Sequence, residues 1–252
     1  MTDTAVPAAT LILVREPAYG PLESRPELLM VERAAGMAFA GGALVFPGGR
    51  IDEADRDLAA TRGNPDCAPH VAAIRETLEE TGVAVGLTPQ PSPQAALGLQ
   101  SQLLAGTPFA ALLANAGLAL DPAALTPFAR WVPELDIKRR FDTMFLVARA
   151  PPGDWIPNPQ QGECSAAMWI GAAEALARAA RGEERLIFPT RRNLERLAQQ
   201  ADFAAIVADA AAHPIVPITP WFEDTPQGRI IRIADDLGYP VTSEPLGSLW
   251  RG

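Results

Sequence analysis

The part of the sequence with the clearest chemistry is a short acidic run, residues 75–83, in which Glu76, Glu79 and Glu80 follow Arg75. On a helix that turns about 100° per residue, these three carboxylates lie on one side, within about 100° of one another. Like charges at this spacing destabilise a helix, and a divalent cation reverses that effect because hard oxygen ligands suit magnesium. Such a cluster is also typical of a solvated helix face, so the run by itself leaves a metal site and a surface face as alternatives.

The residues around this run predict how it is positioned. A helix is expected over residues 68–81, with Pro69 in its first turn and Gly82 as its stop signal. Arg75 precedes Glu79 by one helical turn, a spacing at which the guanidinium group holds the carboxylate in place. The apolar residues opposite the glutamates fall within about 60° of one another and predict a buried stripe. They are Val71, Ile74 and Leu78.

Short apolar runs separated by turn signals predict further strands and helices. Strands are expected at Thr10–Val14, Leu28–Val31, Ala43–Phe46, Phe128–Pro133, Phe141–Ala148, Met168–Ile170 and Ile230–Ile233. Later helices are expected at Gly171–Ala180, Thr190–Gln200 and Phe203–Ala212. Residues 56–67 are polar and are interrupted by Gly63 and Pro65, which predicts a loop. The mixture predicts a single α/β (α+β) domain over residues 1–252.

The segment of about residues 86–127 differs from the rest in composition. Pro89, Pro91 and Pro93 open it, and two stretches rich in alanine and leucine follow, Gln94–Leu104 and Pro108–Ala116. These stretches predict two short helices, which would form a helical insertion in the domain.

Composition and charge exclude several classes of protein. The chain has 21 basic and 30 acidic residues, hence a formal net charge of −9, which argues against a nucleic-acid partner. Two cysteines are too few for a disulfide framework or a four-cysteine zinc site. The two histidines form no HExxH pattern, so zinc-protease chemistry is excluded.

The sequence also bears on location and partners. There is no apolar run near 18 residues and no secretory signal pattern, so no membrane partner is expected and a cytoplasmic location is the default. The expected partner is a small-molecule nucleotide substrate, and a homodimer is left open.

Residues 46–55 place a strand end, a glycine turn and further acids ahead of the acidic run. Together the two stretches resemble the Nudix box, G-x5-E-x7-R-E-U-x-E-E-x-G-U, in which U is a bulky aliphatic residue. The matching residues are Gly49, Asp55, Arg75, Glu76, Glu79, Glu80, Gly82 and Val83. The chain departs from the box in two ways. Asp55 occupies the first glutamate slot, and 19 residues rather than 7 separate it from Arg75, so 12 are inserted at about residues 56–67.

The resemblance implies a Nudix α/β/α sandwich, in which a mixed sheet lies between helices. It implies Mg²⁺ (or Mn²⁺) held by Glu76, Glu79, Glu80 and the Gly49 carbonyl, and a catalytic set of Glu76, Glu79, Arg75 and one further acid. Glu163 is the candidate for that acid, because it follows the loop 157–162 and precedes Trp169 by six residues, as the family's recurrent glutamate does. The alternative is an ordinary loop glutamate.

Shorter motifs resemble one subgroup of the family, which includes the mammalian peroxisomal coenzyme A diphosphatase. The signature L-L-T-x-R-[SA]-x3-R-x3-G-x3-F-P-G-G is matched by Leu29, Arg33, Ala34, Gly42, Phe46, Pro47, Gly48 and Gly49, with Met30 and Val31 as substitutes. Ala38 stands in its second arginine slot. The resemblance implies hydrolysis of a diphosphate linkage in a nucleoside diphosphate derivative, with coenzyme A or acyl-coenzyme A as the first choice.

Two other functions stay open: an ADP-ribose or nucleotide-sugar diphosphatase, and a noncatalytic Nudix module that senses a nucleotide. The candidate substrate-binding residues are Arg33, Arg139 and Arg140, the last two from the densest basic run of an acidic chain. Bidentate guanidinium groups suit phosphates, although charges at the start of a strand are usually solvated surface.

Overall fold

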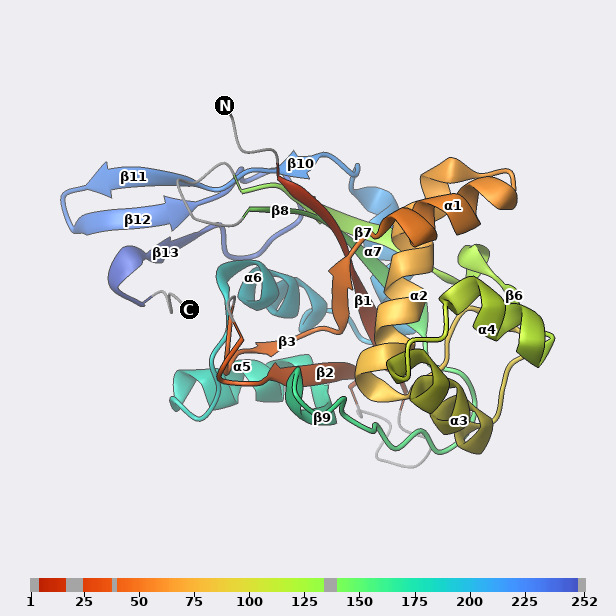
Figure 1. Ribbon diagram of the computed structural model, residues 1–252. Coiled ribbons are helices and arrows are strands. Elements are labelled where there is room, and N and C mark those ends of the chain that lie inside the picture. Colours follow the sequence, from red (N-terminus) through yellow and green to blue (C-terminus); the bar gives the residue numbers. More distant parts are fainter. Residues whose placement is uncertain (1–4, 17–24, 38–39, 134–139, 249–252) are drawn as a thin grey trace.

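The computed structural model describes residues 5–16, 25–37, 40–133 and 140–248 (Figure 1). Its strands are β1 (Val6–Arg15), β2 (Glu27–Arg33), β3 (Leu44–Val45), β4 (Gly48–Arg50), β5 (Leu87–Thr88), β6 (Ala119–Leu120), β7 (Thr126–Trp131), β8 (Phe141–Arg149), β9 (Cys164–Gly171), β10 (Pro217–Ile218), β11 (Trp221–Thr225), β12 (Gly228–Arg232) and β13 (Ser243–Pro245). Its α-helices are α1 (Glu53–Thr61), α2 (Ala68–Thr81), α3 (Pro93–Leu104), α4 (Phe109–Ala116), α5 (Ala172–Ala180), α6 (Phe188–Leu197) and α7 (Phe203–Ala212). Short 3₁₀ helices span Pro65–Cys67, Pro122–Ala124 and Leu246–Ser248.

Strand β1 lies at the centre of the main sheet, whose order is β10-β7-β8-β1-β2-β3, with β4 paired to β1 and β9 paired to β2. The sheet is mixed, since β1 runs parallel to β8 and antiparallel to β2 and β4. A separate antiparallel sheet, β11-β12-β13, extends from one end of the molecule (Figure 1).

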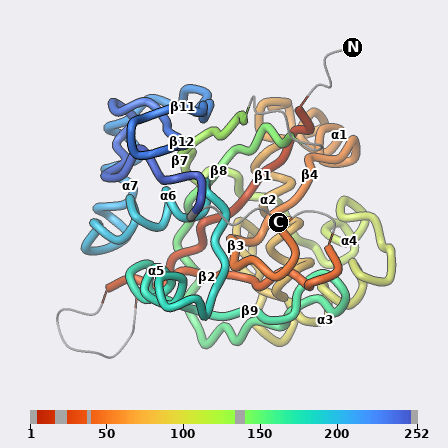
Figure 2. The backbone as a smooth tube through the Cα atoms, turned by 90° about the vertical axis from the view of Figure 1, so that its left-hand side faces the viewer, coloured from red at the N-terminus to blue at the C-terminus, as the bar shows by residue number. Residues whose placement is uncertain are grey.

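Alternation along the central strands sends side chains to two different cores, as the two-residue period of a strand requires. In β1, Leu11 and Leu13 pack on the side of α2, α3 and α4, whereas Ile12 and Val14 pack on the side of α5, α6 and α7. Figure 2 shows these two groups of helices on opposite sides of the sheet. The expected arrangement of a mixed sheet between helical layers is therefore confirmed.

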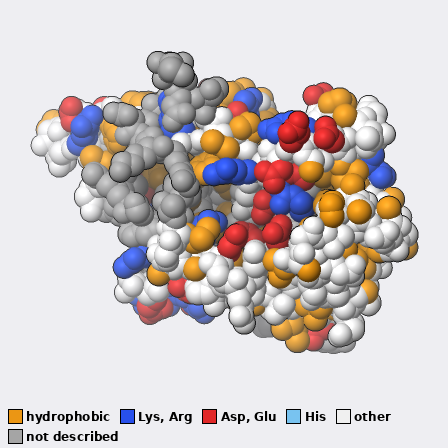
Figure 3. Space-filling model, in the orientation of Figure 1, with side chains coloured by type: hydrophobic (Ala, Val, Ile, Leu, Met, Phe, Trp, Pro, Cys, Tyr) orange, Lys and Arg blue, Asp and Glu red, His pale blue; other side chains and the backbone are white. Residues whose placement is uncertain are grey.

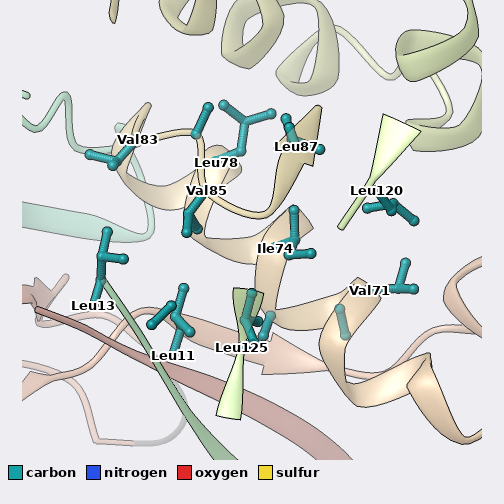
Figure 4. Packing of buried hydrophobic residues seen from close by; sticks show 14 of the residues in the cluster. Leu11, Leu13, Val71, Ile74, Leu78, Val83, Val85, Leu87, Leu120 and Leu125 are labelled. Atoms are coloured by element: carbon teal, nitrogen blue, oxygen red, sulfur yellow. The ribbon is translucent and has the colours of Figure 1, made fainter. Parts of the chain in front are cut away.

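Helix α2 lies against the sheet through the predicted apolar stripe. Val71, Ile74 and Leu78 are at most 1% exposed and belong to one buried cluster with Leu11 and Leu13 of β1 (Figure 4). The burial of each such side chain contributes roughly 1.5–3 kcal/mol, which fixes this helix and the direction of its acidic side.

The longer predicted elements are present within a few residues of their expected bounds, including α3 and α4 in the segment 86–127. The strands that the sequence did not indicate, β4, β5, β6, β10, β11 and β13, are two to five residues long. Such short strands carry too few residues for a clear two-residue period. None of the helices in the described ranges has the length and apolar character needed to cross a membrane.

The expectation of a loop over residues 56–67 is wrong. Most of this segment belongs to α1 and to the following 3₁₀ helix. Asp52 and Asp55 form a capping box at the start of α1, and Ala59 is buried in the core beside α2. The polar composition was misleading because the helix exposes most of its surface and buries one short side chain and one carboxylate.

Replacement of Asp55 by Ala is expected to destabilise the protein by about 2–3 kcal/mol. Asp55 is 2% exposed and accepts two hydrogen bonds from the Arg75 guanidinium, and hydrogen bonds to charged groups contribute about 1.5–3 kcal/mol each. Urea denaturation measures the change. Asp57→Ala, on the exposed side of the same helix, is the matched control, with an expected effect within about 0.5 kcal/mol. Equal losses in the two variants would contradict the role given to Asp55.

Candidate active site

A cavity of about 460 Å³ lies where the start of β4, helix α2 and the start of β9 meet. Its acidic wall contains Glu76 and Glu80 from α2 and Glu163 from the residue before β9, and Arg33 lies among them. The rest of the wall is mainly apolar and includes Met37, Val45, Phe46, Trp131, Phe141, Phe145, Ile187 and Pro189. On the face drawn in Figure 3, acidic and basic side chains gather over the region of β4 and α2.

Arg75 organises the acidic side of α2. Its guanidinium group donates two hydrogen bonds of 2.9 Å to Asp55, and it lies 2.9 Å from Glu76 and 3.3 Å from Glu79. A further hydrogen bond of 3.1 Å reaches the carbonyl of Arg50 at the end of β4. One cation thus joins α1, α2 and β4, and the predicted contact between Arg75 and Glu79 is present.

Glu80 is the most deeply buried carboxylate of the site. It is 2% exposed, and its Oε2 accepts a hydrogen bond of 2.9 Å from the Gly48 amide. Burial and the nearby charge of Glu76 raise the pKa of Glu80 to about 8. Burial also raises the pKa of Glu76 to about 7, although the adjacent Arg75 opposes this shift. Both carboxyl groups therefore have too little positive charge nearby to offset the cost of ionisation.

Gly49 lies directly against the carboxylate of Glu76. A Cβ atom built on Gly49 would clash with Glu76 Oε1, so no side chain fits between the β4 backbone and this carboxylate. The register of β4 with β1, in which Ala9 faces Gly49, sets this close approach. The Gly49 backbone and the Glu76 oxygens therefore share one small space.

Glu163 approaches the same acidic wall from a different part of the chain. The residue is exposed and lines the cavity, and its backbone carbonyl accepts a hydrogen bond of 2.7 Å from the Ala34 amide. Burial is the main cause of the raised pKa of Glu79, and the charge of Glu163 adds to it. The structure thus brings Glu163 to the three glutamates of α2 across 83 or more residues of sequence.

The predicted substrate-binding arginines have different positions. Arg33 ends β2 and lines the cavity. Arg140 precedes β8, and its neighbour Phe141 lines the cavity while Arg140 itself does not. Arg139 lies outside the described residues.

Several residues of the site were missed by the sequence analysis. Asp52 lies 3.8 Å from the Arg75 guanidinium, and the Gly48 amide binds Glu80. Gln100 forms hydrogen bonds with the Glu79 carbonyl near the C-terminal end of α2 and with Asn158. The available signal was Gln100 itself, a polar residue on the otherwise apolar side of α3.

Comparison with known proteins finds a similar fold. No family model matches the sequence. Among solved structures, a Nudix hydrolase from Alicyclobacillus acidocaldarius is similar over 82% of this chain and 97% of that chain, with 28% sequence identity and a TM-score of 0.69. The chain is thus similar to Nudix hydrolases in fold.

Two other Nudix proteins are similar at lower identity. The Nudix domain of Shewanella oneidensis NrtR, in complex with ADP ribose, has 14% identity and a TM-score of 0.46 over 78% of this chain and 88% of that chain. A MutT Nudix hydrolase from Burkholderia pseudomallei has 16% identity and a TM-score of 0.43 over 77% of this chain and 98% of that chain.

Nudix hydrolases generally use divalent metal ions, and the donor set of this chain suits one. Glu76, Glu79, Glu80 and the Gly49 carbonyl all offer oxygen, which hard cations prefer. Within the described ranges, no three acidic, histidine or cysteine side chains are already arranged to hold a metal ion.

The stability of the metal-free protein is expected to fall as pH rises from about 5 to 8. Glu76 and Glu80 titrate at about 7 and 8 when folded, above the ordinary value of 4.5, so the folded state retains protons that the unfolded state releases. Their stabilising effect is therefore complete below the unfolded pKa and is lost as pH rises through 7 and 8. In Glu80→Gln the fall should be smaller. Thermal denaturation with excess chelator measures it, and an unchanged pH dependence in this variant would contradict the burial argument.

Proposed function

We propose that this protein is a Nudix hydrolase that cleaves the diphosphate linkage of coenzyme A or an acyl-coenzyme A, with Mg²⁺ as cofactor. Hydrolysis of nucleoside diphosphate derivatives in general follows from its similarity to Nudix hydrolases. The finer proposal rests on one observation: a single cavity combines the carboxylates Glu76, Glu80 and Glu163 with Arg33 and a long apolar wall.

The carboxylates supply the metal-binding end of the cavity in this proposal. Glu76, Glu79, Glu80 and the Gly49 carbonyl would hold Mg²⁺ (or Mn²⁺), and the Gly49 backbone lies directly against the Glu76 carboxylate. When bound, the cation neutralises the diphosphate and makes water more acidic. Without that positive charge, a chain of net charge −9 would repel a polyanionic substrate.

The other groups act directly on water and substrate. Glu163 is exposed at the cavity and accepts the proton of the attacking water as general base. Arg75 keeps the side chains of Glu76 and Glu79 oriented through its contacts with both. Arg33 stabilises the negative charge of the leaving phosphate, since guanidinium groups bind phosphate oxygens in pairs.

The choice of coenzyme A is supported by where the subgroup signature lies. Arg33, Phe46, Gly48 and Gly49, four residues of that signature, all line the cavity. The apolar wall, which includes Phe141 and Phe145, suits the pantetheine or acyl part of such a substrate. Arg139 and Arg140 remain proposed contacts for its 3′-phosphate.

ADP-ribose or a nucleotide sugar is the second candidate, and Ala38 is the observation that favours it. The signature has an arginine where this chain has Ala38, so one phosphate contact expected for coenzyme A is missing. A noncatalytic sensor is disfavoured because all three glutamates of the acidic helix are retained.

Glu76→Gln is expected to lower kcat at least about 100-fold with the fold intact, the size of effect seen when a main electrostatic element is removed. The assay measures release of the two phosphorylated products with Mg²⁺, and chelation of the metal should abolish activity reversibly. The matched control is Glu53→Gln, an exposed residue at the start of α1. Near-normal activity of Glu76→Gln at saturating Mg²⁺ would contradict the proposed metal site.

Arg140→Ala is expected to lower kcat/KM for coenzyme A more than for dephospho-coenzyme A, by about 1.5–3 kcal/mol, because Arg140 is a proposed contact of the 3′-phosphate. Arg33→Ala, at the leaving phosphate, should lower kcat/KM for both compounds equally. Parallel assays of wild type, Arg33→Ala, Arg140→Ala and the exposed control Arg56→Ala with both compounds and ADP-ribose test this. Equal losses for both coenzyme A compounds in Arg140→Ala would contradict its contact with the 3′-phosphate. Turnover of ADP-ribose without coenzyme A cleavage would select the second candidate.

A further inference from the structure

Helix α3 places one polar side chain in the core beside the catalytic helix. The buried side of α3 consists of Ala96, Leu99 and Gln100, and Gln100 is 1% exposed. A buried amide is costly unless its hydrogen bonds are made. Its partners therefore indicate why a glutamine is found there.

The Gln100 amide joins α2 to the loop that leads to Glu163. Gln100 Nε2 donates hydrogen bonds of 2.9 Å to the carbonyls of Glu79 and Asn158. Gln100 Oε1 accepts a hydrogen bond of 2.8 Å from Asn158 Nδ2. Both donors and one acceptor position of the amide are thus satisfied by these two partners.

The same loop binds the next two carbonyls of α2. The Glu80 carbonyl accepts from the Gln160 amide at 2.9 Å, and the Thr81 carbonyl accepts from the Asn158 amide at 2.7 Å. The last carbonyls of a helix have no partner inside the helix, so these contacts satisfy groups that would otherwise be left unpaired. Three successive carbonyls, starting at Glu79, are bound by Gln100 and the loop.

The loop then turns directly into Glu163. The Gln160 carbonyl accepts hydrogen bonds from the amides of Glu163 at 3.4 Å and Cys164 at 3.0 Å. The position of the Glu163 backbone relative to α2 is therefore set through the loop residues 158–160. Gln100 is the side chain that fastens this loop to the glutamate-bearing helix.

Gly82 gives independent support for the importance of this contact. A Cβ atom on Gly82 would lie 2.8 Å from Gln100 Oε1, so any side chain there would displace the amide. Gly82 also has φ of 68°, a left-handed conformation that favours glycine. The absence of a side chain at Gly82, where α2 ends, thus leaves room for the Gln100 amide of α3.

We propose that Gln100 is a positioning residue for hydrolysis: it holds Glu163 at a fixed place relative to the glutamates of α2. This inference rests on the role given to Glu163 in the proposed function. It also assigns to α3 a part in assembling the active site. A displacement of about 1 Å in a reacting group costs up to about 100-fold in rate, so the loss of this contact is expected in kcat rather than in KM.

Gln100→Leu keeps a similar volume and removes the three hydrogen bonds. We expect kcat to fall about 10- to 100-fold and KM to change less than about twofold. Asn158→Ala, a change at an exposed residue, removes the Asn158 side-chain contact alone and should produce a smaller fall in kcat without loss of folding. The matched control is Gln102→Leu, on the exposed side of the same helix, which should retain the wild-type kcat.

Combination with Glu163→Gln separates positioning from a general structural effect. If Gln100 acts through Glu163, Gln100→Leu should cause no further loss in the residual activity of Glu163→Gln. A wild-type kcat in Gln100→Leu, or the same fold-loss in both backgrounds, would overturn the positioning role alone. Wild-type activity of the single variant Glu163→Gln would instead overturn the proposed role of Glu163, and the positioning role with it.

Discussion

The need to place several carboxylates close together, in a partly buried site, constrains the rest of this structure. Glu76 and Glu80 have raised pKa values because burial and mutual repulsion are only partly compensated. Arg75 compensates Glu76 and Glu79 through direct contacts, whereas the Gly48 amide and the charge of Arg33 compensate Glu80. Since an arginine stays charged at any ordinary pH, this compensation is permanent and does not depend on a bound ion.

This constraint explains why α1 is a helix with a buried aspartate. Asp55 faces Arg75 with both oxygens and fixes the guanidinium group at the height of the glutamates. The side chain of an aspartate is shorter than that of a glutamate, but it reaches Arg75 because α1 packs close to α2 through Ala59. Part of the insertion between Asp55 and Arg75 thus belongs to α1 and packs in the core through Ala59, so it does not simply lengthen a surface loop.

In the C-terminal half of α2, the acidic side chains and the backbone carbonyls have different surroundings, and both suit the proposed chemistry. Its acidic middle and last turn face a cavity whose opposite wall is apolar, so charge is concentrated at one end of the space available to a substrate. Its C-terminal carbonyls are bound by Gln100 and the loop 158–160, which leaves little freedom for the segment that carries Glu163. Rigid placement of this kind is what a general base and a metal site both require.

The local features of this protein can be predicted from its amino-acid sequence. The stripe of Val71, Ile74 and Leu78 predicts α2 and its buried side, because a helical period is visible within a few turns. The spacing of the glutamates is of the same kind, and it predicts Glu76 and Glu80 as site residues. Glu163 and Arg33 were predicted from the resemblance to Nudix signatures, and all four residues line one cavity.

The contacts between residues distant in sequence become apparent in the tertiary structure. Three contacts join residues that no local pattern connects. They are the ion pair of Asp55 with Arg75, the close approach of Gly49 to Glu76, and the hydrogen bond of Gln100 to Asn158. The same holds for α1, whose polar composition indicates a loop until its few buried atoms are seen against α2. Periodicity reports which side of an element is buried, whereas a polar contact depends on the distance between elements, and packing of the whole chain sets that distance.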